Sequence, residues 1–126
     1  MKKSDLNIKE WQELYKVVWS ILEYQAKINQ AISYGELCQK ITRYKLKPND
    51  EALHKILGEI SVDEVRNGKG MLSVFCGKEN QSLMPGNGFF KLAIDLGKQF
   101  GNKKDFVQLE REKIHQKLRD PSMLTF

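Results

Sequence analysis

The chain has 126 residues, of which 40% are hydrophobic and 29% charged, and it carries a net charge of +5 at pH 7. This length is enough for one domain with its own core, and no apolar segment reaches the ~20 residues needed to span a bilayer. The opening residues, MKKSDLNIKEWQELYK, also lack the apolar run of a signal peptide. We therefore expect a soluble, cytoplasmic, single-domain protein with no membrane partner.

A long amphipathic helix is predicted near the N-terminus, reaching about Ala31. Asn7 and Glu10 have the spacing of a capping box, in which each side chain accepts from the backbone N–H group of the other residue. Apolar and aromatic residues then recur at helical spacing: Trp11, Leu14, Tyr15, Val18, Ile21, Leu22 and Ile28. This face is expected to pack in the core, and a partner-binding helix is the alternative.

Two further helices are predicted before residue 68. Ser33 and Glu36 form a second capping box, which opens a helix of about two and a half turns. Asp50 or Asn49 can cap a third helix that reaches Ile60, and Ser61 can cap a separate short turn of helix after it. Two short helices, a third segment and then a β element is the order of a winged helix-turn-helix.

A β element is predicted between the helices. Residues 71–76 are apolar at most positions, which predicts a strand buried on both faces. After a polar turn, Leu83 and Met84 can return as a short second strand, which ends at Pro85 because proline has no N–H to donate. The P-G-N-G corner at 85–88 permits a tight bend, which either packs closely or binds an anion at the next helix.

Together these elements predict a mainly α fold with a small β element, of the α+β class, in a single domain at 1–126. Its winged helix-turn-helix-like core spans about residues 30–100. A C-terminal helix is predicted at 103–119. The apolar tail at 121–126 can dock on the core or on a partner.

No group of side chains predicts catalysis or metal binding. The candidates are two cysteines, two histidines and two acidic pairs: Cys38, Cys76, His54, His115, Asp63 with Glu64, and Glu110 with Glu112. The histidines have no sequence context that places them beside a nucleophile, and the cysteines lack the spacing of a zinc site. The acidic pairs are typical of solvated helix faces. We therefore expect reduced thiols, no cofactor and no metal, and enzymatic activity is unsupported.

A basic strip lies at residues 39–47, QKITRYKLK. It holds no acidic residue and four cations: Lys40, Arg43, Lys45 and Lys47. Two interpretations are open, a solvated loop or a strip that contacts nucleic-acid phosphates with Tyr44 interleaved. The basic charge of the chain favours a polyanionic partner, because cations that meet phosphates release condensed counterions.

Several segments resemble the O6-alkylguanine DNA alkyltransferase and alkyltransferase-like family. Residues 32–37, I-S-Y-G-E-L, resemble the V-S-Y-x-x-L-A opening of that family's helix-turn-helix. Residues 52–58, A-L-H-K-I-L-G, resemble its recognition-helix motif A-x-R-A-V-G. The predicted strand at 71–76 and the corner at 85–88 stand where the family has its P-C-H-R-V-V strand and glycine-rich loop. The resemblance covers about residues 30–97.

The resemblance implies DNA binding without alkyl transfer. By position, Tyr34 would lie by the DNA backbone near a flipped nucleotide, and Lys55 would replace the arginine that fills the vacated base stack. The alkyl-acceptor box is absent, because L-S-V-F at 72–75 occupies its place and Cys76 comes too late. Through Y-G-E-L, L-G-E-I-S, G-x-G-M-L-S and P-G-x-G-F-F-x-L-A, the chain is also similar to a group of small bacterial proteins with no assigned activity.

We therefore expect a non-catalytic nucleic-acid-binding module, with duplex DNA as the favoured partner. The candidate contacts come from the strip and from the two helix motifs: Tyr34, Lys40, Arg43, Lys45, Lys47, His54 and Lys55. One alternative is a protein-interaction module, a regulator or inhibitor of another protein, that uses the wing and the apolar tail. Another is an enzyme that acts on a small phosphorylated ligand at the 85–88 corner.

Overall fold

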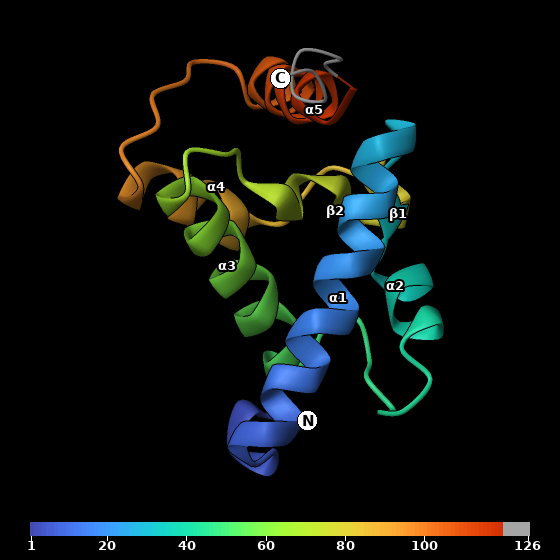
Figure 1. Ribbon diagram of the computed structural model, residues 1–126. Coiled ribbons are helices and arrows are strands. Elements are labelled where there is room, and N and C mark those ends of the chain that lie inside the picture. The colour runs from blue at the N-terminus through green and yellow to red at the C-terminus, as the bar shows by residue number, and fades with distance from the viewer. Residues whose placement is uncertain (120–126) are drawn as a thin grey trace.

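Five α-helices and one small sheet make up residues 1–119, the part of the chain that the computed structural model describes (Figure 1). The helices are α1 (Ile8–Ile28), α2 (Tyr34–Lys40), α3 (Glu51–Arg66), α4 (Asn87–Asp95) and α5 (Lys103–Arg119). The strands are β1 (Ile32–Ser33) and β2 (Cys76–Gly77), and the 3-10 helices are η1 (Lys3–Asp5), η2 (Leu72–Phe75) and η3 (Glu79–Gln81). The predicted class, mainly helical with a small β element, is confirmed. The predicted apolar tail at 121–126 lies outside the described residues.

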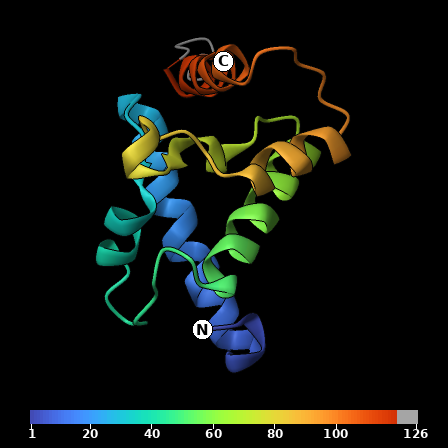
Figure 2. The same cartoon turned by 180° about the vertical axis from the view of Figure 1, so that it is seen from behind.

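The helices α1 and α3 form a V whose open end is covered by α5 (Figures 1 and 2). The 3-10 helix η2 sits inside this V, where it packs against α1, α3 and α5 and all four of its residues are buried. β1 and β2 pair in parallel, with Ile32 opposite Cys76 and Ser33 opposite Gly77, so the start of α2 is joined to the end of η2. Among residues 1–119, none of the helices has the length and apolar character needed to cross a membrane.

The predicted strand at 71–76 is wrong, because most of this segment forms η2. An apolar run alone does not distinguish a buried strand from a buried helical turn. The surroundings decide, since η2 packs among the helices α1, α3 and α5, and no strand of residues 1–119 shares ladder hydrogen bonds with it. The Val74 N–H donates instead to the Met71 carbonyl at 2.9 Å, and the Ser73 N–H donates to the Ser61 hydroxyl at 3.0 Å.

Both predicted capping boxes are confirmed. The Glu10 N–H donates to the Asn7 side chain at 2.8 Å at the start of α1. The Glu36 N–H donates to the Ser33 hydroxyl at 3.0 Å at the start of α2. In each box the glutamate side chain accepts in return from the backbone of the capping residue, so N–H groups that a first helical turn leaves free are satisfied.

The helix α3 is continuous to Arg66, so the predicted break at Ser61 is wrong. Ser61 caps no new turn because its hydroxyl is buried against that of Ser73, 2.6 Å away. Asp50 occupies the predicted N-cap position, but its side chain makes no capping bond to the helix. Its carboxylate accepts from the Lys47 N–H at 2.9 Å, which orders the end of the preceding loop.

A row of aromatic donors on α1 binds a row of carboxylates on α3. Its hydrogen bonds run from Trp11 Nε1 to Glu59 at 3.0 Å, from the Tyr15 hydroxyl to Asp63 at 2.6 Å, and from Trp19 Nε1 to Glu64 at 2.7 Å. The donors recur every four residues, so they share one face of α1. This packing buries Glu64, and Glu110 on α5 is buried as well, so the prediction of two solvated acidic pairs is wrong for both residues.

The Tyr15 bond predicts a loss of stability at alkaline pH. Partial burial, followed by the hydrogen bond to Asp63, raises the pKa of the Tyr15 phenol above its ordinary value of about 10. The folded state therefore keeps a proton that the unfolded chain releases, so this contribution is complete below about pH 10 and is lost as the pH rises through the folded pKa. We expect urea denaturation between pH 8 and 11 to show a shallower decline for Tyr15→Phe than for wild type.

The matched control for this prediction is Tyr24→Phe, which changes an exposed tyrosine of the same helix. Its decline with pH should follow that of the wild type. Parallel curves for Tyr15→Phe and Tyr24→Phe would contradict the role given to Asp63.

Candidate nucleic-acid interface

The four cations of the basic strip lie at the end of α2 and on the loop 41–50 that joins α2 to α3. All four side chains are exposed: Lys40, Arg43, Lys45 and Lys47. Ile41 and Leu46 are buried beneath them, 3% and 7% exposed, so the loop is anchored in the core. The loop lies at the end of the molecule opposite α5 (Figures 1 and 2).

One of these cations, Arg43, is already paired within the chain. Its Nη1 binds the carboxylate of Glu13 on α1, and its guanidinium lies over the Tyr44 ring, 5.5 Å from the ring centre. Tyr44, which the sequence places between these cations, is half-buried and packs against the core. The remaining cations of the strip form no ion pair with residues 1–119: Lys40, Lys45 and Lys47.

Tyr34 and His54 meet at the starts of α2 and α3. Their rings pack edge to face, with centroids 5.1 Å apart. The Gly86 N–H donates to the Tyr34 oxygen at 2.9 Å, which fastens α2 to the corner before α4. His54 Nε2 lies 2.7 Å from the Pro48 carbonyl and must carry the hydrogen, because a carbonyl only accepts. This bond fastens the end of the loop 41–50 to α3.

A small cavity of about 120 Å³ lies where these segments meet. Its lining comes from α2, α3, η2 and the P-G-N-G corner: Tyr34, His54, Leu57, Gly58, Ser73, Gly86, Gly88 and Phe89. Burial raises the pKa of the Tyr34 phenol above its ordinary value, so the phenol is neutral at physiological pH. Because its oxygen accepts from Gly86, its own hydrogen is free to donate to a ligand.

The cavity offers no activated nucleophile. The Ser73 hydroxyl is bonded to the hydroxyl of Ser61 and not to a base. Cys38 and Cys76 are free thiols, and burial raises the pKa of each, so both are protonated at neutral pH. Residues 1–119 hold no group of three or more His, Cys, Asp or Glu side chains placed to bind a metal ion.

Lys55 lies on the exposed side of α3, one residue after His54. Its Nζ is 3.4 Å from the Glu51 carboxylate, one helical turn earlier, so its charge is partly offset. Of the predicted contact residues, the structure brings Tyr34 and His54 together, whereas Arg43 and Lys55 each face an acidic partner in the chain.

Arg111 on α5 is a candidate functional residue that the sequence analysis did not identify. It lines a larger cavity of about 540 Å³ between α5 and the turn at 81–84. The signal in the sequence is its spacing, four residues after the buried Val107 and three before the buried Ile114. A cation in that register of an amphipathic helix faces the protein interior and needs internal acceptors.

No protein-family model, curated protein or solved structure matches this chain. Its function has therefore to be inferred from its residues and their geometry. The features that bear on function are the basic strip, the Tyr34–His54 pair with its small cavity, and the larger cavity beside Arg111.

Proposed function

We propose that this protein is a non-catalytic nucleic-acid-binding module that contacts duplex DNA through the loop 41–50 and the start of α3. The observation that carries the proposal is a set of exposed cations on an anchored loop, unpaired with acids of the described chain: Lys40, Lys45 and Lys47. Neutralising DNA phosphates with such cations releases condensed counterions, which supplies most of sequence-independent affinity. An anchored loop loses less conformational entropy on binding than a free one.

In this proposal α2 and α3 are the two helices of a helix-turn-helix, and the segment after them is the wing. The order of the elements supports this, as does the antiparallel bridge between Lys78 and Met84, which closes a hairpin-like turn. The loop 41–50 is longer than the usual turn of about 3–4 residues. The basic strip lies on these extra residues, so in this proposal the loop itself lies beside the DNA backbone.

The Tyr34–His54 pair meets the DNA next to the strip. The neutral Tyr34 phenol can donate to a phosphate oxygen without repelling it. His54, through its bond to Pro48, fixes the position of the neighbouring Lys47. Lys55 must leave Glu51 before it can bind a phosphate, so its contribution is smaller than that of Lys47.

The proposal predicts salt-dependent binding that requires the strip. With a labelled duplex of about 20 base pairs, followed by fluorescence anisotropy, Lys45→Gln/Lys47→Gln should bind about tenfold more weakly than wild type at ~100 mM salt. The slope of log K against log salt concentration should become shallower by about 2, because each lost phosphate contact removes about 0.9. The control Lys9→Gln/Lys91→Gln removes the same charge at exposed positions outside the strip and should change the affinity less than about twofold.

Single-stranded DNA and RNA of the same length complete the test. Tighter binding to RNA than to duplex DNA at equal salt would overturn the choice of partner. No binding to any of the three at ~50 mM salt would overturn the whole proposal. Equal losses of affinity in Lys45→Gln/Lys47→Gln and in Lys9→Gln/Lys91→Gln would also overturn it, because net charge alone would then explain both losses.

A further inference from the structure

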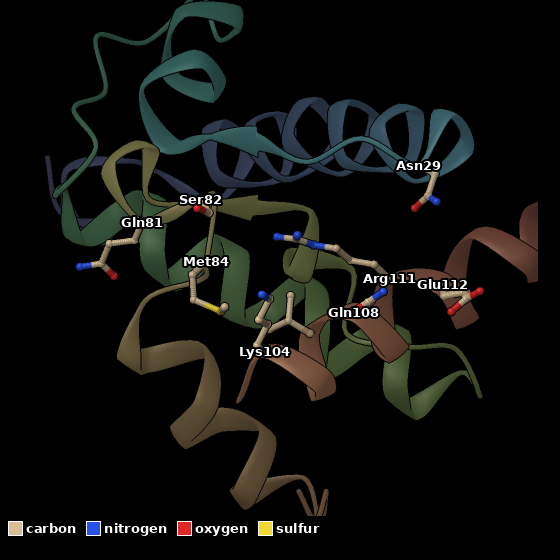
Figure 3. A pocket seen from close by; sticks show the side chains of 9 residues that line it. Asn29, Gln81, Ser82, Met84, Lys104, Gln108, Arg111 and Glu112 are labelled. Atoms are coloured by element: carbon tan, nitrogen blue, oxygen red, sulfur yellow. The ribbon is translucent and has the colours of Figure 1, made fainter. Parts of the chain in front are cut away.

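The cavity of about 540 Å³ lies between the turn after β2 and the first half of α5 (Figure 3). The turn contributes Gln81, Ser82 and Met84, and α5 contributes Lys104, Gln108 and Arg111. In Figures 1 and 2, α5 lies at the end of the molecule opposite the loop 41–50, and the segment that holds η3 lies between them. The cavity shares no lining residue with the loop 41–50 or the start of α3, the segments proposed to contact DNA.

Arg111 is held at this cavity by two backbone carbonyls. Its Nε donates to the Val74 carbonyl at 2.9 Å, and its Nη2 donates to the Leu83 carbonyl at 2.7 Å. A guanidinium has five N–H donors, so three remain without a hydrogen-bond partner among residues 1–119. No carboxylate of the described chain pairs with it, although it is half-buried and burial lowers its pKa from the ordinary value. Half-buried arginines are normally paired because removing the charge from water costs free energy.

The other charged side chains leave the Arg111 side of the cavity positive. Lys104 is seven residues earlier on α5, so it lies on the same face of the helix two turns away. Among residues 1–119, Glu112 is the acidic residue that lines the cavity, and Figure 3 shows its side chain on the other side of the view from the Arg111 guanidinium. Of the described residues that line the cavity, an anion entering beside Arg111 therefore meets two cations, Arg111 and Lys104, on its side.

The turn at 81–84, which faces Arg111 across the cavity, has a backbone conformation that costs free energy. Ser82 and Leu83 both have positive φ, 54° and 61°, in the left-handed region that side chains disfavour. Hydrogen bonds fix the turn, from the Leu83 N–H to the Lys78 carbonyl at 2.9 Å and from Arg111 to the Leu83 carbonyl. Such conformations persist where the surrounding structure enforces them, and here they form one wall of the cavity. Met84 and Val107 add apolar surface beside the amides of Gln81 and Gln108.

We propose that this cavity binds a small molecule through an oxyanion, a carboxylate or a phosphate, with Arg111 as the anchor and Lys104 as the second cation. The amide side chains and Ser82 bind the polar remainder of the ligand, and Met84 and Val107 pack against its carbon skeleton. A preformed guanidinium with free donors fits both oxyanions, because both accept parallel N–H bonds.

The test uses the full chain, labelled with ¹⁵N, and two probes, inorganic phosphate and succinate, each titrated to about 20 mM at constant ionic strength. We expect saturable shifts of the Arg111 Nε–H resonance and of the Ser82 and Gln108 amides with at least one probe. The probe that saturates at lower concentration identifies the oxyanion. Lys104→Gln, which removes no side-chain hydrogen bond between residues 1–119, should raise the Kd about fivefold or more.

Lys91→Gln is the matched control, because Lys91 is exposed on α4 and does not line the cavity. Its Kd should stay within about twofold of wild type. Shifts that fail to saturate with both probes would overturn the proposal. Equal weakening by Lys104→Gln and Lys91→Gln would also overturn it, since the anion would then be sensing the general field of the protein. Because loop 41–50 is intact in both variants, neither result depends on DNA binding.

Discussion

Replacing Gly77 with alanine is expected to destabilise the protein by about 3 kcal/mol, because the new methyl group has no space. A β-carbon at Gly77 overlaps the carbonyl group of Leu83 and lies 2.8 Å from the carbonyl carbon of Met84. The turn cannot retreat freely, since the Leu83 N–H is bonded to Lys78 and the Leu83 carbonyl to Arg111. The variant must therefore break one of these bonds or displace β2 from β1.

Urea denaturation followed by circular dichroism measures this loss. Gly88→Ala is the matched control, because a β-carbon there meets no atom within 4 Å and the residue lies in the first turn of α4. Alanine favours a helix over glycine, so the control should be as stable as wild type or more stable by up to about 1 kcal/mol. A wild-type midpoint for Gly77→Ala would contradict the close approach of the turn to β2.

Features set by residues three or four apart are predictable from this sequence. The boxes at Asn7 and Ser33 follow from local hydrogen bonding, and the helical face of α1 follows from its apolar period. The exposure of the basic strip is local as well, since Ile41 and Leu46 anchor the loop and the charged residues beside them point to solvent.

Features set by distant segments are not predictable in this way. Residues 71–76 have the composition of a strand, but three helices pack around them, and within the described part of the chain only Cys76 has a strand partner. Arg43 meets Glu13 across 30 residues, and Tyr34 meets Gly86 across 52. No local pattern encodes either pair, so the sequence does not tell which cations of the strip remain free or that Tyr34 and the corner share one cavity.

The burial of Glu110 is the clearest example of a feature that the local sequence does not predict. The three residues that follow it in the sequence, R-E-K at 111–113, are charged, which predicts a solvated helix face, yet Glu110 is only 3% exposed. Its Oε2 accepts from the Met71 N–H at 2.9 Å, and its Oε1 lies 3.1 Å from Lys113 Nζ. Lys98 Nζ, from the segment between α4 and α5, lies 3.9 Å away. The carboxylate thus joins α5 to the backbone at the entrance of η2.

Replacing Glu110 with alanine is therefore expected to lower the free energy of unfolding by about 3 kcal/mol or more. The variant leaves the buried Met71 N–H without its acceptor and opens a cavity where the side chain packed. Glu110→Gln keeps the size of the side chain and one acceptor oxygen, so we expect about half of that loss. Urea denaturation at pH 7 measures both.

The control for Glu110 is Glu112→Ala, an exposed position two residues further along the same helix, with an expected change within about 0.5 kcal/mol. All three variants remove one negative charge from α5, and alanine favours a helix more than glutamate or glutamine does. Neither net charge nor helix propensity can therefore produce a large loss for Glu110→Ala, a smaller one for Glu110→Gln and almost none for Glu112→Ala. This order of stability losses is expected only if the buried Glu110 carboxylate and its hydrogen bond to Met71 stabilise the fold. Equal stabilities for Glu110→Ala and Glu112→Ala would contradict that role.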